Sequence, residues 1–313
     1  MLNDWYHQTT DELWPQAASG GPPPADNGLI NGTNVYKRGG ERYQTSVTSG
    51  KSYRLRLVNG AINTMFRFSI DGHKLTVIGS DLVAIKPYVT DSINLGMGQR
   101  YDVIVTANQK PGNYWLRAVP QTACSAANLQ TLNIKGIFNY DSVDVATPRT
   151  ASKVAKDDCE DETELVPFVE LNANSSGLQD VFDIGIDTSS GLFRWTINNN
   201  NFLSDWGEPS MYTSLHVYEA YTDLDPALEQ VIDGSTTWQT DQQVVHLNEV
   251  DQWVYFVIQS VIGWHTSSGF ALQLIERQSE IAATVDAGKL KDTCSKWNAF
   301  QDKNRIVQDD SGV

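Results

Sequence analysis

Histidine and cysteine are the residue types in this sequence that could bind a metal or act as nucleophiles. The histidines fall in no His-x-His, His-x-x-His or His-Glu-x-x-His pattern, and the cysteines form no Cys-x-x-Cys pair. This spacing excludes a zinc ribbon, a thioredoxin-type motif and a metalloprotease helix. Of the histidines, all except His265 are best interpreted as structural. The residues concerned are His7, His73, His216, His246, His265, Cys124, Cys159 and Cys294.

Three local features bear on the compartment of the protein. Asn31 and Asn174 each begin an N-x-[ST] sequon, which fits an exported glycoprotein. An odd number of cysteines suggests one disulfide and one remaining thiol, and the residues alone leave the pairing open. Residues 1–7 show neither the basic start nor the apolar stretch of a signal peptide. These features favour export without deciding it.

In the first half of the chain, the elements that must position these residues are predicted to be β-strands. Asn59-Gly60, Asp71-Gly72 and Pro111-Gly112 are turn signals that separate apolar–polar alternations. Short strands at this spacing, without a helical period of useful length, predict an all-β sandwich or barrel for residues 28–140. The predicted strands are residues 52–58, 66–70, 75–78, 101–105 and 114–119.

The second half is less regular. Strand-like patterns occur at residues 193–197, 253–258 and 270–275, with long polar stretches between them. The acidic run at residues 157–162 predicts a solvated linker, and the polar tail predicts one helix at about residues 280–290. Because the strands are too few for the length, a second sandwich in this half is expected to be incomplete.

The charge of the chain restricts its partners. Lys and Arg total 23 against 38 for Asp and Glu, which makes the formal net charge −15. A general nucleic-acid binder needs a basic face to replace phosphate counterions, so no nucleic-acid partner is expected. No stretch approaches the roughly 18 apolar residues of a membrane span, so no membrane partner is expected either.

Several segments, in the right order, resemble the ascomycete laccases, which are multicopper oxidases built from three cupredoxin domains. Asp-Trp-Tyr-His at residues 4–7 resembles the strand that opens the second domain, and Phe-Arg-Trp-Thr-Ile-Asn at residues 193–198 resembles the start of the third. Gln-Asp-Asp-Ser-Gly-Val at residues 308–313 is similar to the C-terminal plug of these enzymes. The other similar segments are residues 24–33, 53–59, 68–73 and 98–103.

This resemblance implies copper as cofactor and one-electron oxidation of phenolic donors, coupled to reduction of dioxygen to water. A blue copper site needs two histidines and a cysteine thiolate, and the trinuclear site of the family uses His-x-His pairs. Only His265, as a remnant blue-copper ligand, and Phe270, at the axial position, carry over. The block that should supply the cysteine and further histidines is missing between Gln259 and Trp264. The chain as written is therefore expected to be inactive.

The resemblance assigns three further features. Asp26 matches the carboxylate that receives a phenolic proton at the substrate pocket, and the alternative is an ordinary Asx turn before Gly28. A disulfide is expected between Cys124 and Cys159, which leaves Cys294 free.

The resulting interpretation is an all-β chain of tandem cupredoxin-like (plastocyanin-like) Greek-key sandwiches, the second one incomplete. It assigns residues 1–145 to the second cupredoxin domain, 146–165 to an acidic linker, 166–277 to a truncated third domain and 278–313 to a tail with the plug. The function is a laccase-like multicopper oxidase by family, extracellular by family, with a phenol and dioxygen as partners. The alternatives are a redox-silent interaction or structural protein of cupredoxin fold, and a mis-assembled or mis-spliced full laccase.

Overall fold

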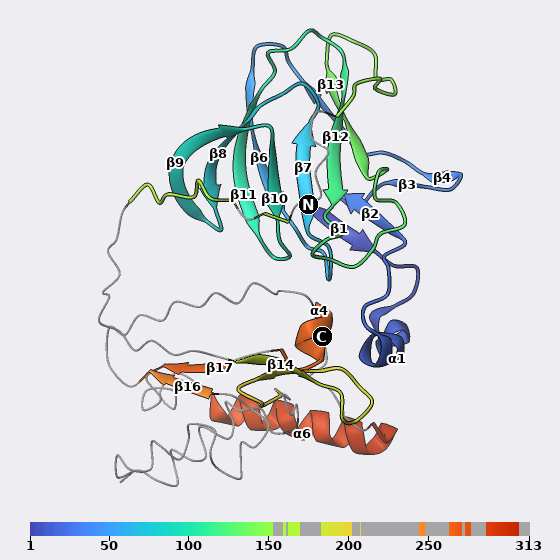
Figure 1. The fold of residues 1–313 in the computed structure, drawn as a ribbon, viewed down its shortest axis with the longest axis vertical. Coiled ribbons are helices and arrows are strands. Elements are labelled where there is room, and N and C mark those ends of the chain that lie inside the picture. Colours follow the sequence, from blue (N-terminus) through green and yellow to red (C-terminus); the bar gives the residue numbers. More distant parts are fainter. Residues whose placement is uncertain are drawn as a thin grey trace. The chain divides into compact units, whose positions relative to one another are not determined.

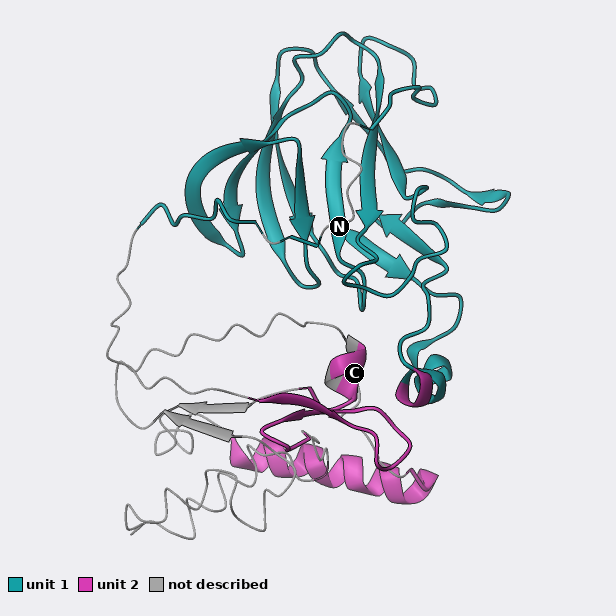
Figure 2. Cartoon of the chain, viewed as in Figure 1, with its two compact units in different colours: residues 1–17, 21–172, 259–262 teal, residues 18–20, 173–258, 263–313 magenta. Residues whose placement is uncertain are grey.

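The computed structural model describes residues 1–152, 159–160, 162–169, 183–201, 207, 244–247, 263–270, 273–276 and 286–306 (Figure 1). The chain divides into two compact units (Figure 2). Unit 1 comprises residues 1–17, 21–172 and 259–262, and unit 2 comprises residues 18–20, 173–258 and 263–313.

Unit 1 is built on two sheets. The larger has the strand order β10-β7-β12-β13-β5, and the smaller has the order β6-β11-β8-β9 (Figure 1). All neighbours are antiparallel except β13 and β5, which run parallel. The larger sheet contains β5 (Gln44–Val47), β7 (Phe66–Ile70), β10 (Ser92–Leu95), β12 (Asn113–Pro120) and β13 (Lys135–Tyr140). The smaller contains β6 (Ser52–Val58), β8 (Leu75–Ser80), β9 (Val83–Thr90) and β11 (Arg100–Thr106).

The core of unit 1 comes from the apolar positions of these strands. Phe66 and Phe68 of β7, Leu75 and Val77 of β8, and Val103 of β11 are almost completely buried. Full burial of a side chain of this kind contributes about 1.5–3 kcal/mol relative to leaving it exposed. The all-β prediction for residues 28–140 is confirmed, because the same alternation that predicted the strands supplies this core.

The predicted strands correspond closely to the observed ones. β6 and β7 have the predicted bounds, and β8, β11 and β12 extend the predicted ranges by one or two residues. β9 was not predicted, since Pro87 interrupts its pattern. It lies at the edge of the smaller sheet, where a proline without an N–H is tolerated.

Helix α1 (Thr10–Gly20) was also missed, although its start has a clear signal. The Thr9 hydroxyl accepts a hydrogen bond from the Glu12 amide at 3.3 Å, and the Glu12 carboxylate accepts one from the Thr9 amide at 2.9 Å. This capping box stabilises the first turn. The helix returns the chain so that β1 (Leu2–Trp5) can pair antiparallel with β2 (Asn27–Ile30). A second short pair follows, β3 (Val35–Tyr36) with β4 (Gly39–Gly40).

Glu162, in the acidic run that the sequence predicts as a linker, contacts both sheets of unit 1. Glu162 accepts hydrogen bonds from the Tyr88 hydroxyl on β9 at 3.0 Å and from the Asn94 amide on β10 at 2.9 Å, so one carboxylate connects the two sheets. Burial, followed by the charge of Glu162, raises the pKa of Tyr88. The backbone at Val166 and Phe168 then bonds to β9 and covers its edge.

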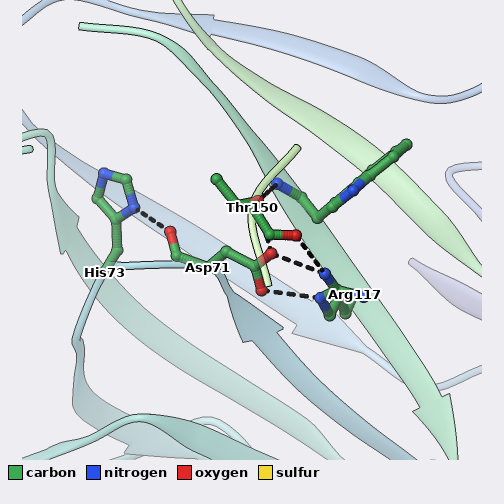
Figure 3. Close-up of polar contacts among 5 residues, drawn as sticks. Asp71, His73, Arg117 and Thr150 are labelled. Atoms are coloured by element: carbon green, nitrogen blue, oxygen red, sulfur yellow. Dashed lines mark hydrogen bonds and ion pairs between the residues drawn. The ribbon is translucent and has the colours of Figure 1, made fainter. Parts of the chain in front are cut away.

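The segment before residue 152 is held by a buried ion pair (Figure 3). Arg117 on β12 donates two hydrogen bonds to Asp71, both 2.8 Å long. The Thr150 hydroxyl donates to the same carboxylate at 2.6 Å, and its carbonyl accepts from Arg117 at 3.2 Å. The polar composition that suggested a free linker instead supplies partners for buried groups on the sheet.

The described part of unit 2 contains short paired strands together with helices. β14 (Ile184–Asp187) pairs antiparallel with β15 (Arg194–Ile197), and β16 (Val244–Leu247) pairs parallel with β17 (Gln273–Glu276). α4 (Gly263–Ser267) precedes β17, and α6 (Ala287–Asn304) follows it. The strand predicted at 253–258 and the plug at 308–313 lie outside the described residues, and the strand predicted at 270–275 is found at 273–276.

The helix predicted at about residues 280–290 has the wrong bounds. α6 begins after Asp286, whose side chain accepts a hydrogen bond from the Lys289 amide at 2.9 Å, an N-cap that fixes the start. The helix then runs on to Asn304. No helix among the described residues is long and apolar enough to cross a membrane.

Candidate functional site

Asp26 lies where the β1–β2 pair ends. Trp5 pairs with Asn27 in this antiparallel register, so the residues that follow Trp5 and the residue that precedes Asn27 also lie close together. The His7 backbone N–H donates to Asp26 Oδ2 at 2.9 Å, and His7 Nδ1 lies 3.3 Å from Asp26 Oδ1. The Gly28 amide donates to Asn27 Oδ1 at 2.9 Å, so the Asx-turn alternative is not the arrangement found. The partner of the Asp26 carboxylate is His7.

The sequence interpretation of His7 as a merely structural histidine missed this pairing. His7 and Asp26 are separated by α1, and only the antiparallel register of β1 with β2 brings them together. The Thr9-x-x-Glu12 capping box was the available signal, because a short helix at this position predicts that the chain returns. Spacing of histidines alone could not have shown it.

Asp26 is accessible, and exposed apolar residues lie on the neighbouring backbone segments. Its side chain is 29% exposed, and that of His7 is 44% exposed. Trp5 on β1 is 51% exposed and Leu129 is 62% exposed. The Leu129 amide donates to the Ala25 carbonyl at 2.9 Å, which places this leucine beside the Asp26 segment. An accessible carboxylate can accept a hydrogen bond from a hydroxyl group, and nearby exposed apolar residues favour a molecule that combines a ring with that hydroxyl.

His265 and Phe270 lie together in unit 2, as part of an aromatic cluster. The Trp195 ring centroid is 4.6 Å from that of His265 and 5.1 Å from that of Phe270. The Phe270 amide donates to the His265 carbonyl at 2.8 Å. Burial lowers the pKa of His265, which favours the neutral imidazole.

The remaining predicted residues fall into two groups. Cys124 and Cys159 form a disulfide, and Cys294 is a free thiol buried on α6. Asn31 is exposed in the turn after β2, where a sequon is accessible, whereas Asn174 lies outside the described residues. The structure leaves glycosylation a prediction.

His73, which the sequence analysis interprets as structural, is buried. Nδ1 lies 2.9 Å from the Asp71 carbonyl and Nε2 lies 2.9 Å from the Tyr140 hydroxyl (Figure 3 shows the first contact). The Tyr114 and Phe138 rings meet its imidazole edge to face. With both ring nitrogens engaged inside the core, His73 is structural.

Comparison with known proteins identifies the family. The multicopper oxidase family model matches residues 1–142. Laccase-2 of Botryotinia fuckeliana is 31% identical and Laccase-1 of the same fungus is 34% identical, each over all of this chain and 65% of the relative. The solved laccase of Botrytis aclada superposes with a TM-score of 0.83 at 29% identity, covering 100% of this chain and 70% of that one. This chain belongs to the multicopper oxidase family.

The solved multicopper oxidase Fet3p shares the fold with a TM-score of 0.70, at 15% identity over 98% of this chain and 70% of that one. The cupredoxin-like architecture of the multicopper oxidases therefore extends beyond the closely similar laccases. The chain spans just under two thirds of the length of Laccase-1 and Laccase-2. The alignment with Laccase-2 runs over 400 residues, although this chain has 313, so the relative contains residues without counterparts here.

A multicopper oxidase implies copper, and the described residues do not fit a blue copper site. Such a site needs two imidazoles and a thiolate around one ion. The ring contacts of His265 are with Trp195 and Phe270. Within the part of the chain that the structure describes, no group of three or more His, Cys, Asp or Glu side chains is arranged to hold a metal. His265 and Phe270, the two residues that the resemblance assigns to the blue site, lie together without such a ligand set among the described residues.

Proposed function

We propose that this chain belongs to a laccase-type oxidase of phenolic donors and contributes the carboxylate that receives the hydroxyl of the donor. The observation that carries the proposal is the position of Asp26, which is accessible, held by His7, and next to backbone segments that expose Trp5 and Leu129. A phenol presents an apolar ring with a hydroxyl donor, which complements this surface. An ionised carboxylate accepts such a hydrogen bond and can act as a general base toward it.

The activity of the whole oxidase, oxidation of phenols with reduction of dioxygen to water, is part of the same proposal. For this chain by itself we propose that it holds no blue copper and oxidises no phenol. The intense colour of a blue site comes from a copper–thiolate bond, and no cysteine occurs in the segment between Gln259 and His265. Cys294 lies buried on α6.

The domain assignment is likewise proposed. We take residues 1–145 as the second cupredoxin domain of the oxidase, 166–277 as the remnant of the third, and 278–313 as its tail with the plug. The disulfide and the accessible Asn31 sequon support an extracellular location, because disulfides persist in oxidising compartments.

The test is metal analysis after copper loading and dialysis, combined with oxidation of 2,6-dimethoxyphenol. We expect substoichiometric, pale copper and no turnover above a His265→Ala control. Tightly held copper near one equivalent with an intense blue band, or turnover that depends on His265, would overturn the proposal for this chain.

A further inference from the structure

The contact between His7 and Asp26 has two points, and both come from one residue. The backbone N–H binds Oδ2 and the ring nitrogen Nδ1 faces Oδ1. A carboxylate with a single partner can rotate about its terminal torsion, whereas one with neighbours at both oxygens rotates less freely. Here the backbone N–H supplies a hydrogen bond to Oδ2, and the ring supplies a contact with Oδ1 at 3.3 Å. His7 therefore sets the plane of the Asp26 carboxylate, while the exposed lone pairs remain open to a ligand.

The position of His7 is itself set from two directions. Its backbone follows directly on β1, which is held in register against β2. Its ring meets the Tyr36 ring edge to face, with centroids 4.5 Å apart. Lys37 Nζ lies 5.2 Å from the centroid of the same Tyr36 ring and places a positive charge next to it.

Stability does not explain this arrangement well. Exposed ion pairs contribute only about 0–1 kcal/mol to folding, because water screens them and the side chains lose entropy. His7 and Asp26 are both accessible, as expected of groups that meet a ligand from solution.

We propose that His7 is a positioning residue for Asp26, whose carboxylate it orients to accept the hydroxyl of a phenol. The inference rests on the proposed function of Asp26 and adds a residue to it. An Nδ1 that faces a carboxylate oxygen carries the proton, so neutral His7 takes the Nδ1–H tautomer. The Nδ1–H then faces Oδ1, and the phenolic hydroxyl donates to the exposed side of the same carboxylate. No proton is transferred in this binding step.

The first experiment reads the tautomer. ¹⁵N chemical shifts of the His7 ring are recorded on the full chain at about pH 8, where an ordinary imidazole is neutral. We expect the Nδ1–H signature in the wild-type chain and its loss in Asp26→Asn. The same tautomer in both proteins would overturn the orientation of Asp26 by His7.

The second experiment measures binding of 4-methoxyphenol to the same proteins by NMR titration. Removal of the ring contact leaves the Asp26 carboxylate freer to rotate out of the orientation that binds, which predicts weaker binding by about three- to tenfold in His7→Phe. His7→Asn, whose side-chain N–H can replace Nδ1–H, should bind within about twofold of the wild-type chain. Asp91→Asn, at an exposed carboxylate on the surface, is the control for a change of charge and should have no effect.

The two readouts separate the inference from the proposed function. Unchanged binding in His7→Phe would contradict the positioning role, even with binding lost in Asp26→Asn. Absence of binding by the wild-type chain, with the Nδ1–H signature intact, would contradict the proposed phenol site and support the orientation of Asp26 by His7.

Discussion

The strands of the two units differ in how many neighbours support them. In unit 1, β7, β12, β13, β8 and β11 each lie between two other strands. In the described part of unit 2, β14 pairs with β15 and β16 pairs with β17, each as a two-stranded sheet. An isolated two-stranded sheet is marginally stable in water, whereas wider sheets with a shared core unfold cooperatively.

The contrast extends to burial. The strands of unit 1 bury large side chains such as Phe66 and Tyr140 completely. On β14, Ile184 and Ile186 are more than half exposed. Among the described residues, unit 1 therefore combines wide sheets with a buried core, whereas the strands described in unit 2 are short and, on β14, more exposed.

Hydrogen exchange should show the largest difference between the units. Amides of β7 and β11, at Phe68 and Val103, should exchange about a hundredfold or more slowly than amides of β14 and β15, at Ile186 and Trp195. Protection tracks the cooperative unit that must open, and the two-stranded pair opens at lower cost. Mass spectrometry of deuterium uptake in the full chain measures both regions at once. Equal protection in both would show that unit 2 unfolds as cooperatively as unit 1.

The single substitution with the largest expected loss of unfolding free energy is one that breaks the buried ion pair of unit 1. Asp71→Asn leaves the Arg117 guanidinium, 11% exposed, without its anionic partner, and the expected loss is about 3–5 kcal/mol. Urea unfolding followed by fluorescence measures it. Asp91→Asn is the matched control, since its pair with Lys74 is exposed and should contribute about 0–1 kcal/mol. Similar losses in both variants would contradict the role of burial.

Removing the disulfide tests whether the segment after residue 159 belongs to unit 1. The bridge closes a loop between cysteines 35 positions apart, which corresponds to roughly 3–4 kcal/mol of chain entropy. The double variant Cys124→Ser, Cys159→Ser should lose about this amount in urea unfolding, and the protection of β9 should fall. Cys294→Ala, which removes a thiol from unit 2, should leave β9 unchanged. Unaltered protection of β9 in the double variant would mean that the backbone bonds of Val166 and Phe168 suffice.

A smaller effect is expected from pH, through His73. Burial lowers the pKa of His73, and the charge and carbonyl of Asp71 oppose this only in part. The unfolded chain therefore binds the proton more tightly, so stability present above about pH 6.5 is lost as the pH falls below it. Unfolding of unit 1 between about pH 7 and pH 5 should depend less on pH in His73→Gln than in the wild-type chain. Identical slopes would exclude His73 as the cause.

The sequence by itself determined the family and five strands of unit 1, β6, β7, β8, β11 and β12. Alternation over residues 52–58 and 66–70 is a local pattern, and it predicted β6 and β7 because side chains along a strand point to opposite faces. Motifs such as Asp-Trp-Tyr-His were enough for the resemblance to laccases, and the absence of His-x-His was enough to doubt copper binding. These properties depend only on residues that are close together in the sequence.

Only the tertiary structure decided which residues meet. The pairing of His7 with Asp26 depends on the register of two strands separated by a helix. The partners of Glu162 come from β9 and β10, far away in the sequence, so its acidic segment resembled a free linker. Contacts of this kind are set by how strands pair and sheets pack, and local composition does not encode the pairing.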